Sequence, residues 1–298
     1  MISVILYGRN DNYGYNLHKR ATLSLNCFAE VLSEKNDEII FVDYNTPDDF
    51  PTFPEAVQDL LTSSCKQKLR VVRVRENIHT VLYSKQTHLF TLEPIARNVA
   101  IRRMNKNNKW VLSTNTDMIF LPKGKNSLNE IFRNFENGNY SAPRLEIPET
   151  IWESFDRLNP REIIKDLQKY SKALHLHEVV SGDIWNLYDA PGDFQLFTRE
   201  DALKIGGFDE DMMLGWHCDS NLNKRLMMLN GKTNDASNYL DGFHCDHTRQ
   251  VTPMHKSGSK SNDLNKFVLE LQAPEANREN PWGLLNYELE NIKLNDLT

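Results

Sequence analysis

Short β-rich runs alternate with helical stretches through the first 120 residues, and this alternation constrains the fold more than any other feature of the sequence. Strands are predicted over residues 2–6, 38–42, 71–74 and 110–113. Apolar residues three or four positions apart predict helices over 16–33, 54–61 and 92–104. Strands that alternate with helices form parallel sheets with both faces covered. We expect an α/β fold, a single compact domain with a mixed but mostly parallel central sheet flanked by helices.

Polar residues follow three of the predicted strands. They are Tyr7-Gly8-Arg9, Asp43 and Asn115-Thr116-Asp117. Ligands of such sheets bind at the carboxyl ends of the strands. Asp117 also precedes an apolar run, where a carboxylate is costly unless it has a role. It is either a turn residue that caps the next element or a ligand for Mg²⁺ or Mn²⁺, which bind carboxylates and substrate phosphates.

The second half of the chain is less regular. Helices are predicted near 160–174 and over 199–205 and 221–229, with a strand over 194–198. The polar segment 248–265 is expected to be a mobile loop, and Trp282, Leu285, Leu289 and Ile292 predict a C-terminal helix packed on the domain. No Pro/Gly/Ser-rich linker divides the chain. We assign residues 1–121 to the binding of one ligand, 122–250 to the binding of a second ligand and to catalysis, and 251–298 to the mobile loop and the C-terminal helix packed on the domain.

Three short motifs in the second half carry groups that could act on a substrate. They are Gly206-Gly207-Phe208-Asp209-Glu210, Trp216-His217-Cys218-Asp219 and His244-Cys245-Asp246-His247. Asp219 could equally be a first-turn carboxylate favoured by a helix dipole. The two histidines could bind zinc, but a structural zinc site takes four N or S ligands, and only His217 and Cys218 could complete it.

Composition excludes several classes of protein. The net charge of −6 argues against a general nucleic-acid-binding surface, so we expect no nucleic-acid partner. Four cysteines without Cys-x-x-Cys spacing indicate reduced thiols rather than a disulfide scaffold. No run of 18 apolar residues crosses a membrane. We expect a cytoplasmic protein with at most peripheral contact at the inner face of the membrane.

The order of the motifs along residues 1–250 resembles nucleotide-sugar glycosyltransferases of the GT-A (Rossmann-like) fold, similar to family 2 and to the galactosyltransferase-like branch. The resemblance rests on Arg9-Asn10, the strand 38–43, Ala96-Arg97-Asn98, the segment 111–117, Gly206 to Glu210, Trp216 to Asp219, and His244. It implies an inverting transferase that moves a sugar from a nucleotide diphosphate donor, expected to be a UDP-sugar, to a hydroxyl of a glycan or glycolipid. Surface polysaccharide or lipopolysaccharide synthesis is the expected setting.

The resemblance also implies roles for individual residues. Asp219 would be the catalytic base. Tyr7, Arg9, Asp43, Arg97, Asn115 and Asp117 would bind the donor. Asp193, Trp216 and Asp209 would bind the acceptor. A divalent cation, Mn²⁺ or Mg²⁺, would be held by Asp117 and His244, with His247 as the competing histidine, and would neutralise charge on the leaving diphosphate.

Two departures from the family pattern keep other functions open. Asn115 stands where the first Asp of the family's D-x-D motif is expected, and Cys218 replaces a Glu. These changes favour a non-catalytic nucleotide-sugar-binding protein of the same fold as the alternative. A nucleotidyltransferase shares the fold only coarsely, and residues 7–10 lack the Gly-rich signature that it would need.

Overall fold

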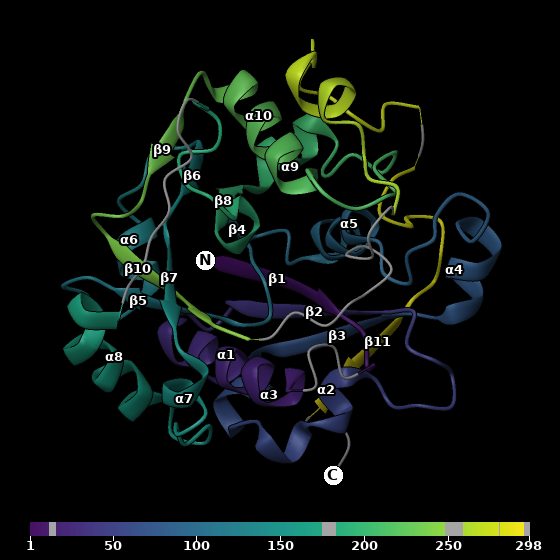
Figure 1. Ribbon diagram of the computed structural model, residues 1–298. Helices are drawn as coiled ribbons and strands as arrows, with labels where there is room; N and C mark the ends of the chain where they lie inside the picture. Colours follow the sequence, from purple (N-terminus) through teal and green to yellow (C-terminus); the bar gives the residue numbers. More distant parts are fainter. Residues whose placement is uncertain (12–15, 175–182, 248–258, 280, 295–298) are drawn as a thin grey trace.

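The computed structural model has a central sheet of eight strands in the order β11-β3-β2-β1-β4-β8-β6-β9 (Figure 1). It describes residues 1–11, 16–174, 183–247, 259–279 and 281–294. Four parallel strands form its centre, β1 (Ile2–Gly8), β2 (Glu38–Tyr44), β3 (Leu69–Val74) and β4 (Trp110–Ser113). Added at its two sides are β8 (Gln195–Thr198), β6 (Asn139–Ser141), β9 (Thr233–Asp235) and β11 (Glu290–Lys293).

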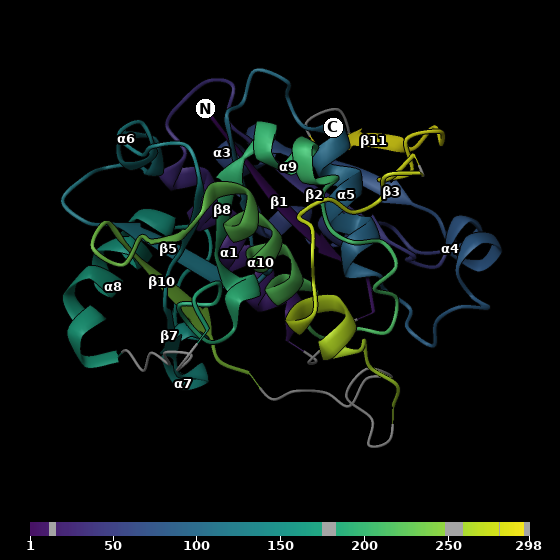
Figure 2. The same cartoon turned by 90° about the horizontal axis from the view of Figure 1, so that it is seen from above.

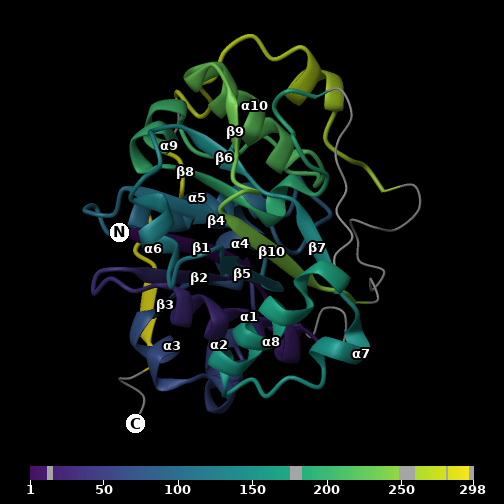
Figure 3. The same ribbon diagram turned by 90° about the vertical axis from the view of Figure 1, so that its left-hand side faces the viewer.

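Helices cover both faces of this sheet (Figure 3). On one face lie α1 (Leu17–Val31) and α3 (Ser63–Lys68). On the other lie α5 (Glu93–Arg103), α9 (Arg199–Ile205) and α10 (Cys218–Asn230), as the view from above shows (Figure 2). Strand β1 explains the layering, because Val4 and Leu6 pack with α1 whereas Ile5 packs with α5. Its side chains are buried on both faces, as expected in a parallel sheet.

A second sheet of three strands, in the order β5-β10-β7, lies beside the first. Its strands are β5 (Met118–Pro122), β10 (Leu240–Cys245) and β7 (Arg144–Ile147). Helix α1 is buried between the two sheets, since Leu25 packs with the main sheet while Leu23 and Cys27 pack with the small one and with α8 (Pro160–Leu174). The chain passes from one sheet to the other between β4 and β5.

Shorter elements complete the described chain. They are α2 (Phe53–Ala56), η1 (Gln58–Leu60), α4 (Glu76–Leu82), α6 (Leu128–Phe132), α7 (Glu149–Trp152), η2 (Pro191–Asp193) and η3 (Asn265–Leu269). Among the described residues no helix combines the length and apolar content needed to span a bilayer.

The predicted α/β fold with a mostly parallel sheet flanked by helices is confirmed. The predicted C-terminal helix is wrong. Residues 282–287 form turns, because Gly283 and Leu284 have φ of +70° and +51°, outside the helical region, and the chain then enters β11. Residues 248–258 of the predicted mobile loop lie outside the described part of the chain.

Glu210 ties this tail to the rest of the domain. Its Oε1 accepts hydrogen bonds from the Asn98 side chain at 2.8 Å and from the Gly283 backbone N–H at 2.7 Å. Asn98 in turn pairs with the backbone of Phe208. Gly207 allows the Asn98 side chain to lie this close to the backbone, since a Cβ at position 207 would lie 2.2 Å from Asn98 Oδ1. Burial raises the pKa of Glu210 to about 7, although its two hydrogen bonds oppose the shift.

The raised pKa of Glu210 predicts a pH-dependent stability. The folded protein holds this proton more tightly than the unfolded chain, so stability should fall as the pH rises from about 4.5 to 7. Glu210→Gln keeps an oxygen acceptor and does not titrate. We compare the free energy of unfolding of this variant with that of wild type at each pH. The difference should be about 3 kcal/mol larger at pH 8 than at pH 4, in favour of the variant, since one pKa unit corresponds to roughly 1.4 kcal/mol.

Urea unfolding at the two pH values measures this difference. Glu288→Gln, which alters an exposed carboxyl in the same tail, is the matched control and should show little pH-dependent gain. An equal gain for both variants would contradict the assignment to Glu210.

Candidate active site

A cleft of about 690 Å³ opens where β1 ends and where the chain passes from β4 to β5. It also reaches the η2 turn and the start of α10. The sequence-predicted residues that line it are Tyr7, Arg9, Asn115, Asp117, Asp193, Trp216, Asp219, His244 and His247. Residues from distant parts of the chain thus meet in one cavity, at the rim of the sheet where ligands of α/β proteins bind.

The metal corner, which we define as Asp117, His244 and His247, lies at the start of the small sheet. Strand β10 runs antiparallel to β5 and places His244 opposite Met118, next to Asp117. The Nε2 atoms of His244 and His247 lie 3.6 and 3.4 Å from Asp117 Oδ2. One ligand atom from each of the three residues lies within 4.8 Å of the others. One carboxylate and two imidazoles so arranged can hold a divalent cation.

The carboxylate at this corner is strongly favoured in its ionised form. Burial alone would raise the pKa of Asp117, but His244, His247 and Arg20 outweigh it and hold that pKa well below its ordinary value. Burial alone would lower the pKa of His244, yet Asp117 and Glu146 raise it to about 10. The imidazole is therefore charged before a cation arrives, and a cation that binds there must displace its proton.

Sequence reasoning missed three charged residues around the metal corner. Glu146 on β7 is in register with His244, and its Oε2 lies 2.8 Å from Nδ1 of that ring. This contact leaves Nε2 directed to Asp117, as second-shell carboxylates do for metal-binding histidines. Arg20, 1% exposed on its side chain, lies 3.5 Å from Asp117. Arg144 pairs with Glu146 at 2.8 Å. No motif signals them, because strand register and helix packing bring them together.

The base corner consists of Asp219, in the first turn of α10, together with the η2 turn and the turn at residues 215–217. Asp219 Oδ2 accepts a hydrogen bond from the Gly192 N–H at 3.1 Å, and Oδ1 accepts one from Ser220 N–H at 2.8 Å. Burial, followed by the charge of Glu93, raises the pKa of Asp219 to about 6. A half-buried carboxylate with such a pKa can accept a proton near neutral pH.

Trp216 reaches the cleft from a strained turn. Gly215, Trp216 and His217 all have positive φ, between 63° and 77°, which costs free energy for the two residues that are not glycine. Asn262 holds this turn, because its side chain accepts from Leu214 N–H and donates to Trp216 O, both near 3 Å. Trp216 is 44% exposed and lines the cleft.

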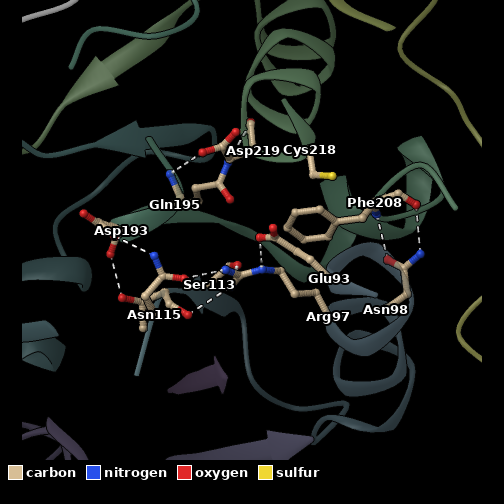
Figure 4. A network of polar contacts seen from close by, with 12 residues as sticks. Glu93, Arg97, Asn98, Ser113, Asn115, Asp193, Gln195, Phe208, Cys218 and Asp219 are labelled. Atoms are coloured by element: carbon tan, nitrogen blue, oxygen red, sulfur yellow. Dashed lines mark hydrogen bonds and ion pairs between the residues drawn. The ribbon is translucent and has the colours of Figure 1, made fainter. Parts of the chain in front are cut away.

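Arg97 on α5 is buried in a network of polar contacts with Glu93, Ser113 and Asn115 (Figure 4). Its Nε is 2.7 Å from Glu93, its Nη1 donates to Ser113 Oγ at 2.6 Å, and its Nη2 donates to Asn115 Oδ1 at 3.0 Å. The ring of Tyr7 lies 5.0 Å from the guanidinium carbon. Arg97 therefore organises the cleft floor instead of lining the cavity itself.

Three predicted site residues are not among those that line the cleft, namely Arg97, Asp43 and Asp209. Asp43 is fully buried, and its Oδ1 accepts a hydrogen bond from Phe53 N–H at 2.7 Å, at the start of α2. Burial raises the pKa of Asp43 to about 6. Asp209 accepts from Asp211 N–H at 3.1 Å, in the loop that Asn98 anchors. Both motifs therefore stabilise local chain turns in this structure.

The metal corner predicts a specific loss of cation affinity. Asp117→Ala should weaken Mn²⁺ binding by about tenfold or more, since even outer-shell partners of metal ligands are worth about 10- to 100-fold. Calorimetric titration with Mn²⁺, without any nucleotide, measures this affinity. Asp246→Ala, which removes an exposed carboxylate between the two histidines, is the control and should bind as wild type does. Equal affinity in all three proteins would remove Asp117 from the ligand set.

No protein-family model matches the chain, and no curated protein matches it. Solved structures do. Staphylococcus aureus TarS 1–349 matches with a TM-score of 0.47 and 12% identity, over 82% of this chain and 60% of that one. Its complex with UDP-GlcNAc matches with a TM-score of 0.47 and 13% identity, over 85% and 62%. The mannosyltransferase PcManGT from Pyrobaculum calidifontis, in complex with GDP-Man and Mn²⁺, matches with a TM-score of 0.46 and 14% identity, over 84% and 57%.

The chain spans about three fifths of the length of these three structures. Two of the three hold a nucleotide sugar, and one is a mannosyltransferase.

Proposed function

We propose that the protein is an inverting glycosyltransferase that moves a sugar from a nucleotide diphosphate donor to an acceptor hydroxyl. One observation carries the proposal: a single cleft contains the metal corner and, as a separate group, the Asp219 carboxylate with its raised pKa. Transfer from a sugar nucleotide needs both a cationic site for the diphosphate and a base for the attacking hydroxyl.

The metal corner suits a divalent cation of intermediate softness. Mg²⁺ prefers an all-oxygen octahedral site, whereas imidazole ligands also suit transition metals. With one carboxylate and two imidazole nitrogens, Asp117, His244 and His247 would hold Mn²⁺ in preference to Mg²⁺. When bound, such a cation supplies positive charge that neutralises the leaving diphosphate.

The side chains of this protein provide the remaining chemistry. Asp219 takes the proton of the acceptor hydroxyl while the acceptor oxygen bonds to the anomeric carbon. The bond from that carbon to the diphosphate oxygen breaks, and its electron pair leaves with the diphosphate. Attack on the face opposite the leaving group inverts the anomeric centre. Arg9 and Arg20 line the cleft with fixed positive charge, which suits an anionic donor.

We propose a UDP-sugar as donor and a glycan or glycolipid hydroxyl as acceptor, in surface polysaccharide or lipopolysaccharide synthesis at the inner face of the membrane. Trp216, with its exposed ring, and Asp193 would bind the acceptor. UDP-GlcNAc and GDP-mannose with Mn²⁺ are the first donors to test. Binding of a donor without hydrolysis or transfer to any acceptor would instead support a non-catalytic nucleotide-sugar-binding protein.

The assignment of Asp219 predicts a loss of rate without a loss of binding. Asp219→Asn keeps the shape of the side chain but cannot take a proton. Transfer should fall by about 10² to 10⁴, the usual contribution of a general base, while donor affinity should change little. Asp211→Asn, which alters an exposed carboxylate in the preceding loop, is the control. Transfer by Asp219→Asn within a few-fold of wild type would contradict the proposal.

The pH dependence of transfer gives an independent check. A base works in its deprotonated form, and the pKa of Asp219 is about 6. The wild-type rate should therefore be constant above that pH and fall as the pH drops through it, by about tenfold per unit well below the midpoint. Asp219→Asn should lack this acidic limb. The same limb in both proteins would assign the titration to another group.

A further inference from the structure

Asn115 belongs to a continuous line of polar contacts, and Figure 4 shows the part of this line from Asp193 to Glu93. Its Nδ2 lies 2.6 Å from Asp193 Oδ1, and its Oδ1 lies 3.0 Å from Nη2 of Arg97. The line begins at the metal corner and ends beside the base corner. In order, its members are His244, Glu146, Arg144, Asp193, Asn115, Arg97 and Glu93.

The chemistry of the two neighbours fixes what residue 115 must be. A guanidinium has only donors, so the atom that faces Arg97 must accept. An ionised carboxylate has only acceptors, so the atom that faces Asp193 must donate. An amide does both at once, and its orientation here is set by its two partners. An Asp at this position would bring a carboxylate within 2.6 Å of another carboxylate.

Asp193 is otherwise firmly held. Its carboxylate is 3.5 Å from Nη1 of Arg144, its carbonyl accepts from Thr114 Oγ1 at 2.6 Å, and its N–H donates to Ala190 O at 3.0 Å. The residue is 4% exposed and lines the cleft. Because it cannot turn away at low cost, a second carboxylate beside it would be repelled instead of accommodated.

We propose that Asn115 is an amide junction that positions Asp193 and Arg97, and that it is not a metal ligand. This inference deepens the proposed function, on which its catalytic part rests. The amide holds the Asp193 carboxylate toward the cleft, where it accepts a hydrogen bond from a hydroxyl of the bound sugar. It also holds the guanidinium of Arg97, which bonds to Glu93 and Ser113 as well. The substitution relative to the family's D-x-D pattern is thus a requirement of this site.

A charge-swap cycle tests the junction without any nucleotide. The four proteins are wild type, Asn115→Asp, Asp193→Asn, and the double variant that exchanges the two side chains. The single Asn115→Asp change should lower Tm at pH 8 by about 3 °C or more, because it buries two facing carboxylates. The double variant restores a donor opposite an acceptor and should recover most of that loss. If the double variant loses as much stability as the two single variants lose together, the junction is overturned.

Mn²⁺ titration of the same proteins separates a junction from a ligand. Asn115→Asp restores the family's D-x-D sequence, so if residue 115 were a ligand position, affinity should rise by about tenfold or more. We expect it to stay within about threefold, with an unchanged electron paramagnetic resonance spectrum of bound Mn²⁺. If wild type does not bind Mn²⁺, the metal assignment fails, whereas the swap cycle still decides the junction.

Turnover distinguishes positioning from mere support of the fold. At a temperature where all four proteins are folded, Asn115→Asp should lower kcat for donor hydrolysis or transfer, and the double variant should recover part of it. An unchanged kcat in the fully folded single variant would reduce Asn115 to a structural role and overturn its positioning role.

Discussion

The cleft depends on the hydrogen bonds and the ion pair that the buried guanidinium of Arg97 makes. A charge removed from water is costly unless it is paired and hydrogen-bonded. Here the side chain of Arg97, with no exposed surface, bonds to Glu93 on its own helix and to Ser113 at the end of β4. It also donates to the backbone carbonyl of Thr114 at 3.0 Å. These contacts lock α5 to the end of β4, where the chain leaves the main sheet.

The exit from the main sheet creates the metal corner. After β4, the chain crosses to β5, and the crossing carries Asn115 and Asp117 at the rim. Three strands of the small sheet then set the neighbours of Asp117, because β10 supplies His244 and β7 supplies Glu146 in register. Arg20 approaches from α1, the helix buried between the sheets. The charges around this corner therefore come from several elements that are distant in the sequence.

The base corner is built in another way, from a helix start and strained turns. Gly192 lets the η2 turn approach Asp219, since a Cβ there would lie 3.1 Å from the carboxylate. The positive φ of Trp216 and His217 is maintained by Asn262, which follows far along the chain. Strain held by surrounding contacts is typical of functional sites. The polar line that includes Asn115 runs from the metal corner toward the base corner.

The sequence by itself determined the four parallel strands, the residues at the strand ends, and the covering helices α1, α5, α9 and α10, but it did not predict α3. The local periodicity of apolar residues determines these features. The bounds of β4 and α9, at residues 110–113 and 199–205, are the ones predicted from the sequence. The sequence also singled out Asp117, Asp219, His244 and His247 as site residues, and the structure places all four at one cleft, while their roles stay predictions. The helical spacing from Trp282 failed, since spacing does not reveal the positive φ of Gly283 and Leu284.

Only the tertiary structure decided which polar residues share the cleft. Asp43 and Asp209 sit in motifs that resemble binding motifs, yet their carboxylates accept nearby backbone N–H groups away from the cavity. Arg20, Arg144 and Glu146 belong to no motif and still surround Asp117 and His244. Helix packing brings Arg20 to Asp117, and strand register brings Glu146 to His244, although each of these pairs is almost a hundred positions apart in the sequence. Hydrophobic period is a local property of a sequence, whereas the pairing of charges depends on contacts between elements that the period does not specify.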